Sequence, residues 1–262
     1  MIIKSNSKKY ILAMSVIIFL VIAIAIVISV MYINNTKKDK PVQEETSVNI
    51  YNDSTFAGDS NILFVCNGDD IGDSVFAMII EFRIYSENIN LVLLDMNCVY
   101  NKQTYSDCYR YGGIDSLINS VQTVRNCQID RYIIIDKAGI GKVTELLGSV
   151  NLYVSDGFTY DTTDKSYEIS AGYNDLESDA LYTYLNILNE KSETSELKTA
   201  ICEIMKNYIA KINPDNSETL FGEICNCVTT NITITDYYTS KSDFNYLLTH
   251  NPECNISDDI EE

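Results

Sequence analysis

Residues 11–33 form an apolar run long enough to cross a membrane. The run reads ILAMSVIIFLVIAIAIVISVMYI and is broken only by Ser15 and Ser29. As a helix that rises about 1.5 Å per residue it reaches roughly 34 Å, slightly more than the hydrocarbon core of a bilayer. A cleaved signal peptide has a shorter apolar core and a small-residue cleavage site, whereas the exit here reads VMYIN. The sequence therefore predicts one uncleaved transmembrane helix over residues 11–33.

The two flanks of this run are almost equally basic. Three lysines precede it and three follow it. The N-terminal amine adds one positive charge before the run, so the positive-inside rule predicts a cytoplasmic N-terminus at residues 1–10. Residues 34–60 are polar and predict a stalk. We therefore expect a single-pass protein of the cell membrane, with an extracytoplasmic domain over residues 61–250 and an acidic tail over residues 251–262.

The charge balance limits the partners. The chain has 37 acidic and 19 basic residues and a net charge of −18. Such a surface repels nucleic acid and anionic headgroups, so we predict no nucleic-acid partner. Acidity also serves the solubility of an exported domain, which is the simpler explanation. Arginine is scarce and occurs only at positions 83, 110, 125 and 131.

Eight cysteines lie in the part that we expect outside the membrane. An even number outside the cytosol permits disulfides, but their pairing cannot be deduced from the sequence, and buried free thiols are the alternative. Cys225 and Cys227 with His250 and Cys254 also have the residue types of a zinc site, although their spacing is irregular. His250 is the single histidine, and we expect it in a C-terminal loop, unsuited to general base catalysis.

Apolar patterns predict an α/β fold in which helices sandwich a sheet. Short runs rich in β-branched residues predict strands at 62–66, 75–82, 91–94 and 129–135. Apolar residues spaced by three and four predict helices from Gly112 to Val124 and over 137–147, then at 176–188, 193–212 and 218–228. Alternating strands and helices followed by further helices favour such layers.

The order of these segments resembles the LytR-CpsA-Psr family. The similarity covers roughly residues 61–240 and rests on an ordered series, NILFV from 61, GDSV from 72, LVLL from 91, YRYGG from 109, IDRYIIID from 129, LGSV from 147 and DALYTY from 179. Members of this family transfer a glycopolymer, such as wall teichoic acid or capsular polysaccharide, from a polyprenyl pyrophosphate carrier to peptidoglycan outside the membrane of Gram-positive bacteria. The resemblance implies a central mixed β-sheet and an apolar tunnel for the polyprenyl chain.

The resemblance also implies candidate site residues. Asp73 matches an acidic position of the family and Asn97 replaces its metal-binding aspartate, so both are candidate ligands of magnesium, the implied cofactor. Arg110 is the guanidinium nearest a matching segment and is the candidate ligand-binding residue. The simpler alternatives are a capping role for Asp73 and a solvated charge at a helix start for Arg110.

Several arginines of the family are replaced. Their positions fall at Ile71 or Gly72, Met96, Leu185 or Asn186, and Ile187. Each charge-assisted contact to phosphate is worth roughly 1.5 to 3 kcal/mol, so together these losses predict weakened or absent transfer.

Three functions stay open at this stage. The leading one is an accessory envelope protein that binds a polyprenyl-linked glycopolymer. Residues 76–80 are candidates to line the tunnel, and ordinary core packing is the simpler explanation for them. The second is an active phosphotransferase with a rearranged site around Asp73, Asn97 and Arg110. The third is an exported interaction or sensing domain that shares only the α/β pattern, since fold does not fix function.

Overall fold

The computed structural model describes residues 58–68, 73–161, 166–191, 194–250 and 252–258. All of them belong to the second of two compact units of the chain, Asn49–Glu262. The predicted cytoplasmic N-terminus, the transmembrane helix at 11–33 and the stalk up to residue 57 lie outside these ranges. Within them, none of the helices has the length and apolar character needed to cross a membrane.

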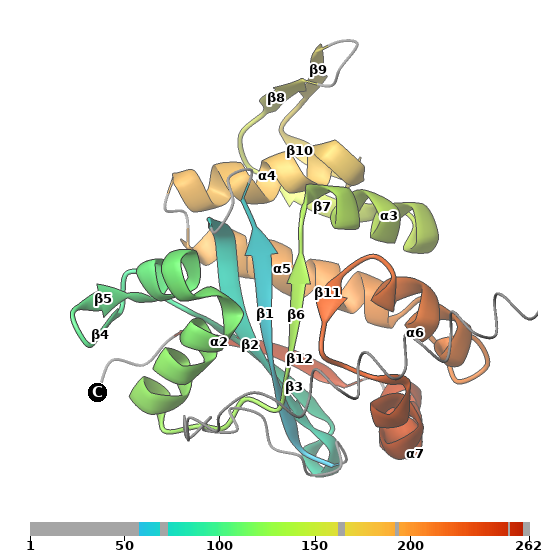
Figure 1. Cartoon of the computed structure of the whole chain (residues 1–262). Helices are drawn as coiled ribbons and strands as arrows, with labels where there is room; N and C mark the ends of the chain where they lie inside the picture. Colours follow the sequence, from blue (N-terminus) through green and yellow to red (C-terminus); the bar gives the residue numbers. More distant parts are fainter. Residues whose placement is uncertain (1–57, 69–72, 162–165, 192–193, 251, 259–262) are drawn as a thin grey trace, which may run out of the picture. The chain divides into compact units, whose positions relative to one another are not determined.

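A six-stranded mixed sheet forms the centre of the domain (Figure 1). In chain order its strands are β1 (Ser60–Asn67), β2 (Ser74–Arg83), β3 (Asn88–Leu93), β6 (Arg131–Ile135), β11 (Thr229–Thr230) and β12 (Glu253–Asp258). They lie side by side in the order β11, β6, β1, β2, β3, β12. β1 is parallel to β6 and antiparallel to β2, and β3 is antiparallel to β2 and parallel to β12. The predicted mixed sheet is confirmed, including its strands at 62–66, 75–82, 91–94 and 129–135.

Helices cover both faces of this sheet, as predicted. They are α2 (Tyr105–Arg125), α3 (Lys137–Leu147), α4 (Ser178–Glu190), α5 (Thr194–Ile209), α6 (Ser217–Cys225) and α7 (Ile234–His250). Because side chains alternate along a strand, β1 contributes to two cores. Leu63 and Val65 pack with α2, while Ile62 and Cys66 pack on the opposite face with α3, α4 and α5. The sheet is therefore the middle layer of three.

Short elements complete the domain. They are the turn η1 (Ile84–Ser86) and the paired strands β4 (Val99–Tyr100) with β5 (Gln103–Thr104), β7 (Val150–Val154) with β10 (Gly172–Leu176), and β8 (Phe158–Asp161) with β9 (Ser166–Ile169). The β8 and β9 hairpin projects beyond α4 in Figure 1. The sequence patterns did not predict these two-stranded ribbons, since their exposed faces interrupt any apolar run with polar residues and tyrosines.

Helix α2 begins earlier than the sequence predicted. The Thr104 hydroxyl accepts a hydrogen bond from the Asp107 N–H at 3.0 Å, and the Asp107 carboxylate accepts one from the Thr104 N–H at 3.2 Å. This capping box starts the helix at Tyr105. Gly113, at φ 68° and ψ −164°, is a kink between two helical halves instead of a helix start. Glycine takes this backbone conformation because it lacks a Cβ.

The C-terminal prediction needs two corrections. His250 is the last residue of α7 and not part of a loop. Residues 253–258, which the composition placed in an acidic tail, form strand β12 at the edge of the sheet. The acidic neighbours obscured the strand pattern, in which Cys254 is buried and Ile256 packs against the same core.

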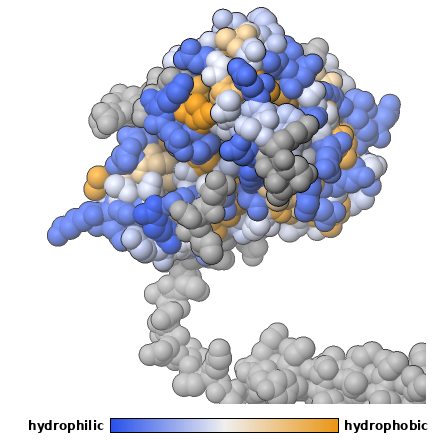
Figure 2. All heavy atoms as spheres, turned by 90° about the horizontal axis from the view of Figure 1, so that it is seen from above, coloured by the Kyte–Doolittle hydropathy of each residue, from blue (hydrophilic) through white to orange (hydrophobic). Residues whose placement is uncertain are grey.

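All eight cysteines are free thiols in the structure, four of them buried. Burial raises the pKa of Cys66 to about 12, and burial followed by the proximity of Cys202 raises that of Cys254 to about 12. Among the ranges that the structure covers, no group of three or more His, Cys, Asp or Glu side chains is placed to hold a metal ion. The surface seen from above is mainly hydrophilic, with hydrophobic residues in small patches (Figure 2).

Candidate functional site

An apolar cavity of about 320 Å³ lies between the sheet and the helices of one face. Its sheet wall includes Ile62, Phe64, Cys66, Phe76, Ile80 and Ile133, and its helix wall includes Ile140, Leu181, Leu185, Ile201 and Met205. The one hydroxyl among the lining side chains, that of Tyr208, is buried and has no hydrogen-bond partner in the described structure. Such a cavity suits hydrocarbon better than water, because water needs polar partners.

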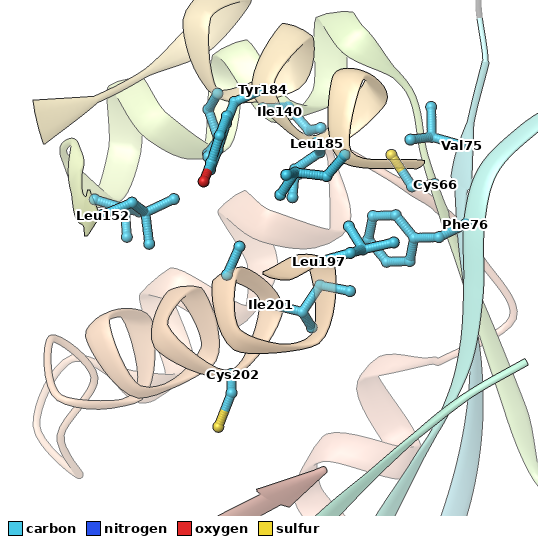
Figure 3. Packing of buried hydrophobic residues seen from close by; sticks show 14 of the residues in the cluster. Cys66, Val75, Phe76, Ile140, Leu152, Tyr184, Leu185, Leu197, Ile201 and Cys202 are labelled. Carbon is cyan, nitrogen blue, oxygen red and sulfur yellow. The ribbon is translucent and has the colours of Figure 1, made fainter. Parts of the chain in front are cut away.

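The strand at 76–80 contributes to this cavity as the resemblance implied. Phe76 and Ile80 line it, while Ala77 and Ile79 pack in the core on the other face. In Figure 3 Phe76 points from β2 toward α5, and Leu185 points from α4 into the same region. Residues of β2 thus serve both as ordinary core and as cavity wall.

A second apolar cavity, of about 200 Å³, adjoins the first under α6 and α7. Residues that line both are Ile62, Phe82, Ile133, Ile212, Ile224, Val228, Phe244 and Leu247. Because the two cavities share these walls, apolar space extends along the sheet from Phe76 toward α7.

Polar side chains gather where β1 ends and β2 begins, next to the apolar cavity. We define the polar rim as Asn67, Asp73, Arg110, Lys137, Asp179 and Tyr182. Asn67 follows Cys66, which lines the cavity, and its side-chain oxygen accepts a hydrogen bond from the Tyr109 hydroxyl at 2.6 Å. Its carbonyl oxygen accepts one from the Tyr182 hydroxyl at 3.3 Å. Burial raises the pKa of Tyr109, although the bond to Asn67 acts against this shift. These bonds tie α2 and α4 to the end of β1.

The structure brings together Asp73 and Arg110, two of the three residues that the rearranged-site hypothesis names. Arg110 Nε donates to Asp73 Oδ1 at 3.0 Å, and its Nη2 donates to the same oxygen. The hydrogen bond with Asp73, followed by its negative charge, raises the pKa of Arg110. Both side chains are more than a third exposed, so water screens the pair and its contribution to folding stability is small. Arg110 is thus an ion-paired residue of α2 and not a solitary solvated charge.

Asn97 lies in a separate polar cavity of about 410 Å³, also lined by Ser74, Asp95, Ser106 and Lys198. Its N–H donates to Asp95 Oδ1 at 2.9 Å. Phe76 lines this cavity and the apolar one, so the two are neighbours. Lys198 is a site residue that the sequence analysis missed, because the start of its helix looked acidic and its place in the same cavity as Asn97 depends on tertiary packing.

Lys137 is a second cation that the sequence analysis missed. Asp136 caps α3 by accepting a hydrogen bond from the Gly139 N–H at 2.7 Å, which places Lys137 in the first turn. The Lys137 ammonium lies 3.5 Å from an Asp179 carboxylate oxygen and 5.7 Å from the centre of the Tyr182 ring. The motif IDRYIIID followed by lysine was the available signal, since it predicts a strand at 129–135 that ends two residues before Lys137.

Within the residues that the structure describes, Asp73 and Asn97 do not form a preformed magnesium site. Asp73 Oδ1 already accepts two hydrogen bonds from Arg110. The other predicted ligand, Asn97, brings no charge, and acidic clusters suited to a cation are absent from the part of the chain that the structure describes. Magnesium in proteins usually takes one or two carboxylates together with phosphate oxygens and water. A metal at Asp73 would share this carboxylate with Arg110.

Two of the positions that the family resemblance aligns with arginines belong to the hydrophobic core of this structure. Leu185 is buried and lines the apolar cavity, and Ile187 packs against the same core. Met96 is partly buried and lines the polar cavity. The positions at 71 and 72 lie outside the described residues. Apolar side chains therefore occupy these three places, which the resemblance aligns with arginines of the family, with Asn186 as the alternative to Leu185.

The sequence model of the LytR_cpsA_psr family matches residues 92–251. The chain belongs to the LytR-CpsA-Psr family. This confirms the family resemblance that the sequence motifs indicated. A search of curated protein sequences found no match.

Solved structures share the fold of this LytR-CpsA-Psr domain. A candidate transcription regulator from Eubacterium siraeum is 18% identical with a TM-score of 0.66, covering 86% of this chain and 91% of its own. TagV of B. subtilis is 13% identical with a TM-score of 0.62, and the match covers 78% of this chain and 85% of the TagV chain. TagT bound to LI-WTA is 12% identical with a TM-score of 0.57, and the match covers 81% of this chain and 83% of the TagT chain. At such identities the likeness establishes the fold alone.

Proposed function

We propose that this chain is a membrane-anchored, extracytoplasmic protein that binds a polyprenyl-linked glycopolymer of the Gram-positive cell envelope and acts as an accessory protein. The hydrocarbon chain occupies the apolar cavity, and the phosphate lies at the polar rim. Transferase activity is weakened or lost. Residues 11–33 anchor the chain with its N-terminus in the cytoplasm, so the bilayer and peptidoglycan are its other partners.

The position of the apolar cavity beside the polar rim carries this proposal. Cys66 and Phe76 line the cavity, and Asn67 and Asp73 lie only a few residues away in the chain. A polyprenyl phosphate has the same division, a long hydrocarbon that ends in an anionic group. Burial of each methylene stabilises the complex by about 0.8 kcal/mol, so a cavity of this size supplies most of the affinity. The TagT structure with LI-WTA shares the fold, which supports the class of ligand.

The charges at the rim support weakened transfer. Arg110 and Lys137 each already pair with a carboxylate, Asp73 and Asp179 respectively. A phosphate that binds these cations must compete with acids that are part of the protein. The family resemblance places an arginine at Leu185 or Asn186, and Leu185 lines the apolar cavity. The rim thus holds an anionic headgroup more weakly than a set of unpaired guanidinium groups does.

Equilibrium binding of a long-chain polyprenyl monophosphate to the purified full chain in detergent tests the proposal. We expect saturable binding that Leu185→Phe weakens about tenfold, because the larger ring excludes about two methylenes, worth roughly 1.6 kcal/mol. Leu117→Phe is the matched control, since Leu117 is fully buried in the core on the opposite face. It should lower the melting temperature and leave lipid affinity unchanged. A wild-type chain that does not bind the lipid would favour the interaction or sensing domain instead.

The second candidate function is glycopolymer phosphotransfer at a rearranged site, for which the polar rim still holds a carboxylate and a guanidinium next to each other, those of Asp73 and Arg110. The assay is transfer of a labelled lipid-linked glycopolymer to peptidoglycan by the full chain, with and without magnesium. Our proposal predicts transfer no faster than in a protein-free control. Magnesium-dependent transfer that Asp73→Ala abolishes would establish the enzyme with Asp73, Asn97 and Arg110 as its site.

A further inference from the structure

The ribbon of β7 and β10 has one buried and one exposed face. Val150, Leu152, Val154 and Leu176 are buried, while Asn151, Tyr153, Tyr173 and Asp175 are exposed. Residues two apart on a strand share a face, so these four exposed side chains form one surface. We call this surface, formed by Asn151, Tyr153, Tyr173 and Asp175, the tyrosine face.

Two aromatic rings dominate the tyrosine face. Tyr153 and Tyr173 are directly opposite each other in the ribbon register, with ring centres 5.3 Å apart and planes at 68°. Tyr153 is 60% exposed and Tyr173 is 77% exposed. Tyrosine supplies a rigid contact surface with an apolar ring and a polar hydroxyl, which suits binding of ligands that are partly apolar and partly polar.

The polar part of the tyrosine face carries only negative charge. Asn151 Nδ2 donates to Asp175 Oδ1 at 2.8 Å, and these residues are also opposite each other in the register. The Asp175 carboxylate has further acceptor positions for hydroxyl donors. Neither strand contains lysine or arginine. The face therefore repels phosphate and carboxylate polymers, including nucleic acids that could otherwise stack on the rings.

The tyrosine face is fixed to the helix that forms the apolar cavity. The Tyr184 hydroxyl of α4 donates to the Tyr153 carbonyl oxygen at 3.1 Å, and Tyr184 is buried. On the same helix Leu181 and Leu185 line the cavity. Because the hydrogen bond from Tyr184 fixes the ribbon to α4, the protein loses little conformational freedom when a ligand binds to the tyrosine face.

We propose that the tyrosine face binds an uncharged glycan chain. Sugar rings stack their C–H faces on Tyr153 and Tyr173, and sugar hydroxyls donate to the Asp175 carboxylate. This inference rests on the proposed function for its physiological setting, since a chain that binds a lipid-linked glycopolymer is exposed to glycans. It adds a glycan contact at a surface distinct from the polar rim.

Ligand-observed NMR titration of the full chain in detergent with chitohexaose, cellohexaose and maltohexaose tests it. We expect binding of at least one of these lipid-free oligosaccharides, weakened at least fivefold by Tyr153→Ala and by Tyr173→Ala. Tyr173→Phe should retain affinity within twofold, because the stacking ring remains. Tyr85→Ala is the matched control, since Tyr85 is 91% exposed on η1, outside the tyrosine face. All variants should keep the wild-type melting temperature, and polygalacturonate, which is anionic, should not bind.

The proposal is overturned if none of the three oligosaccharides binds, if Tyr85→Ala weakens binding as much as Tyr153→Ala, or if polygalacturonate binds as tightly as the neutral probes. Because these probes carry no lipid and no phosphate, their failure leaves the result of the polyprenyl phosphate titration unaffected. Conversely, glycan binding without lipid binding would separate the tyrosine face from the proposed function of the cavity.

Discussion

The ion pair between Arg131 and Asp236 gives the clearest prediction about stability. Arg131 on β6 donates to both carboxylate oxygens of Asp236 on α7, at 3.1 and 2.6 Å, and the two side chains are only 13% and 7% exposed. Asp236 also accepts hydrogen bonds from the N–H and hydroxyl of Thr233, which begin α7. The pair therefore ties this helix to the edge of the sheet near the second apolar cavity.

We predict that Asp236→Asn lowers the free energy of unfolding by about 3 kcal/mol at neutral pH, because it removes the carboxylate charge that pairs with a buried guanidinium. For a domain of this size the melting temperature should fall by roughly 6 to 12 °C. The assay is thermal unfolding followed by circular dichroism. Glu218→Gln is the control, since Glu218 pairs with Lys241 at 2.6 Å on the exposed surface. It should leave the melting temperature unchanged.

The pH dependence of the stability difference between the wild type and Asp236→Asn tests whether the lost carboxylate charge is its cause. Burial acts to raise the pKa of Asp236, but hydrogen bonds from Arg131 and Thr233 and the charge of Arg131 lower it overall from the usual 3.8. The ionised carboxylate therefore stabilises the wild type above this value, and that stability is lost as the pH falls through the lower pKa of the folded state. The difference in the free energy of unfolding between the wild type and Asp236→Asn should therefore disappear as the pH falls below 3.8. A cost under about 1 kcal/mol at neutral pH, or a gap that persists in acid, would refute the reasoning.

Two further predictions follow from backbone geometry and burial. Gly113→Ala should cost about 1 to 3 kcal/mol in denaturant unfolding, because its backbone conformation is almost restricted to glycine; an unchanged midpoint would show that the kink is not needed. The Cys66 thiol, with a pKa raised to about 12, should resist iodoacetamide at about pH 8 until the chain unfolds, as measured by peptide mass spectrometry; rapid alkylation of the native chain would contradict its burial.

The central strands were predictable because their buried residues form short runs of valine, isoleucine and phenylalanine. Helix α3 was predicted with its bounds, since Asp136 and Gly148 mark its ends. Helix α7 was missed because its sequence, ITDYYTSKSDFNYLLTH, is rich in residues that favour the helix weakly. Strand β12 was missed because acidic residues follow its two apolar side chains.

The candidate site was predictable only in part. Family motifs found Asp73, Asn97 and Arg110, but the pairing of Asp73 with Arg110 depends on how α2 packs against the end of β1, and Asn97 lies in a separate cavity. Lys137 and Lys198 are ordinary surface lysines in the sequence, and only the fold brings Lys137 to the polar rim and Lys198 to the polar cavity. Hydrophobic periodicity does not distinguish a filled core from an apolar cavity, because both need buried leucine and isoleucine at the same positions.

The central claim is that the cavity beside Phe76 holds the hydrocarbon of an anionic polyprenyl lipid. Mass spectrometry of apolar extracts from the purified full chain tests it most directly, using membranes of a Gram-positive host as the source. The account predicts a polyprenyl phosphate or its glycosylated form in extracts of the wild type, strongly depleted in Leu185→Phe and retained in Leu117→Phe. Extracts of all three proteins that contain only bulk membrane phospholipid in equal amounts would contradict it.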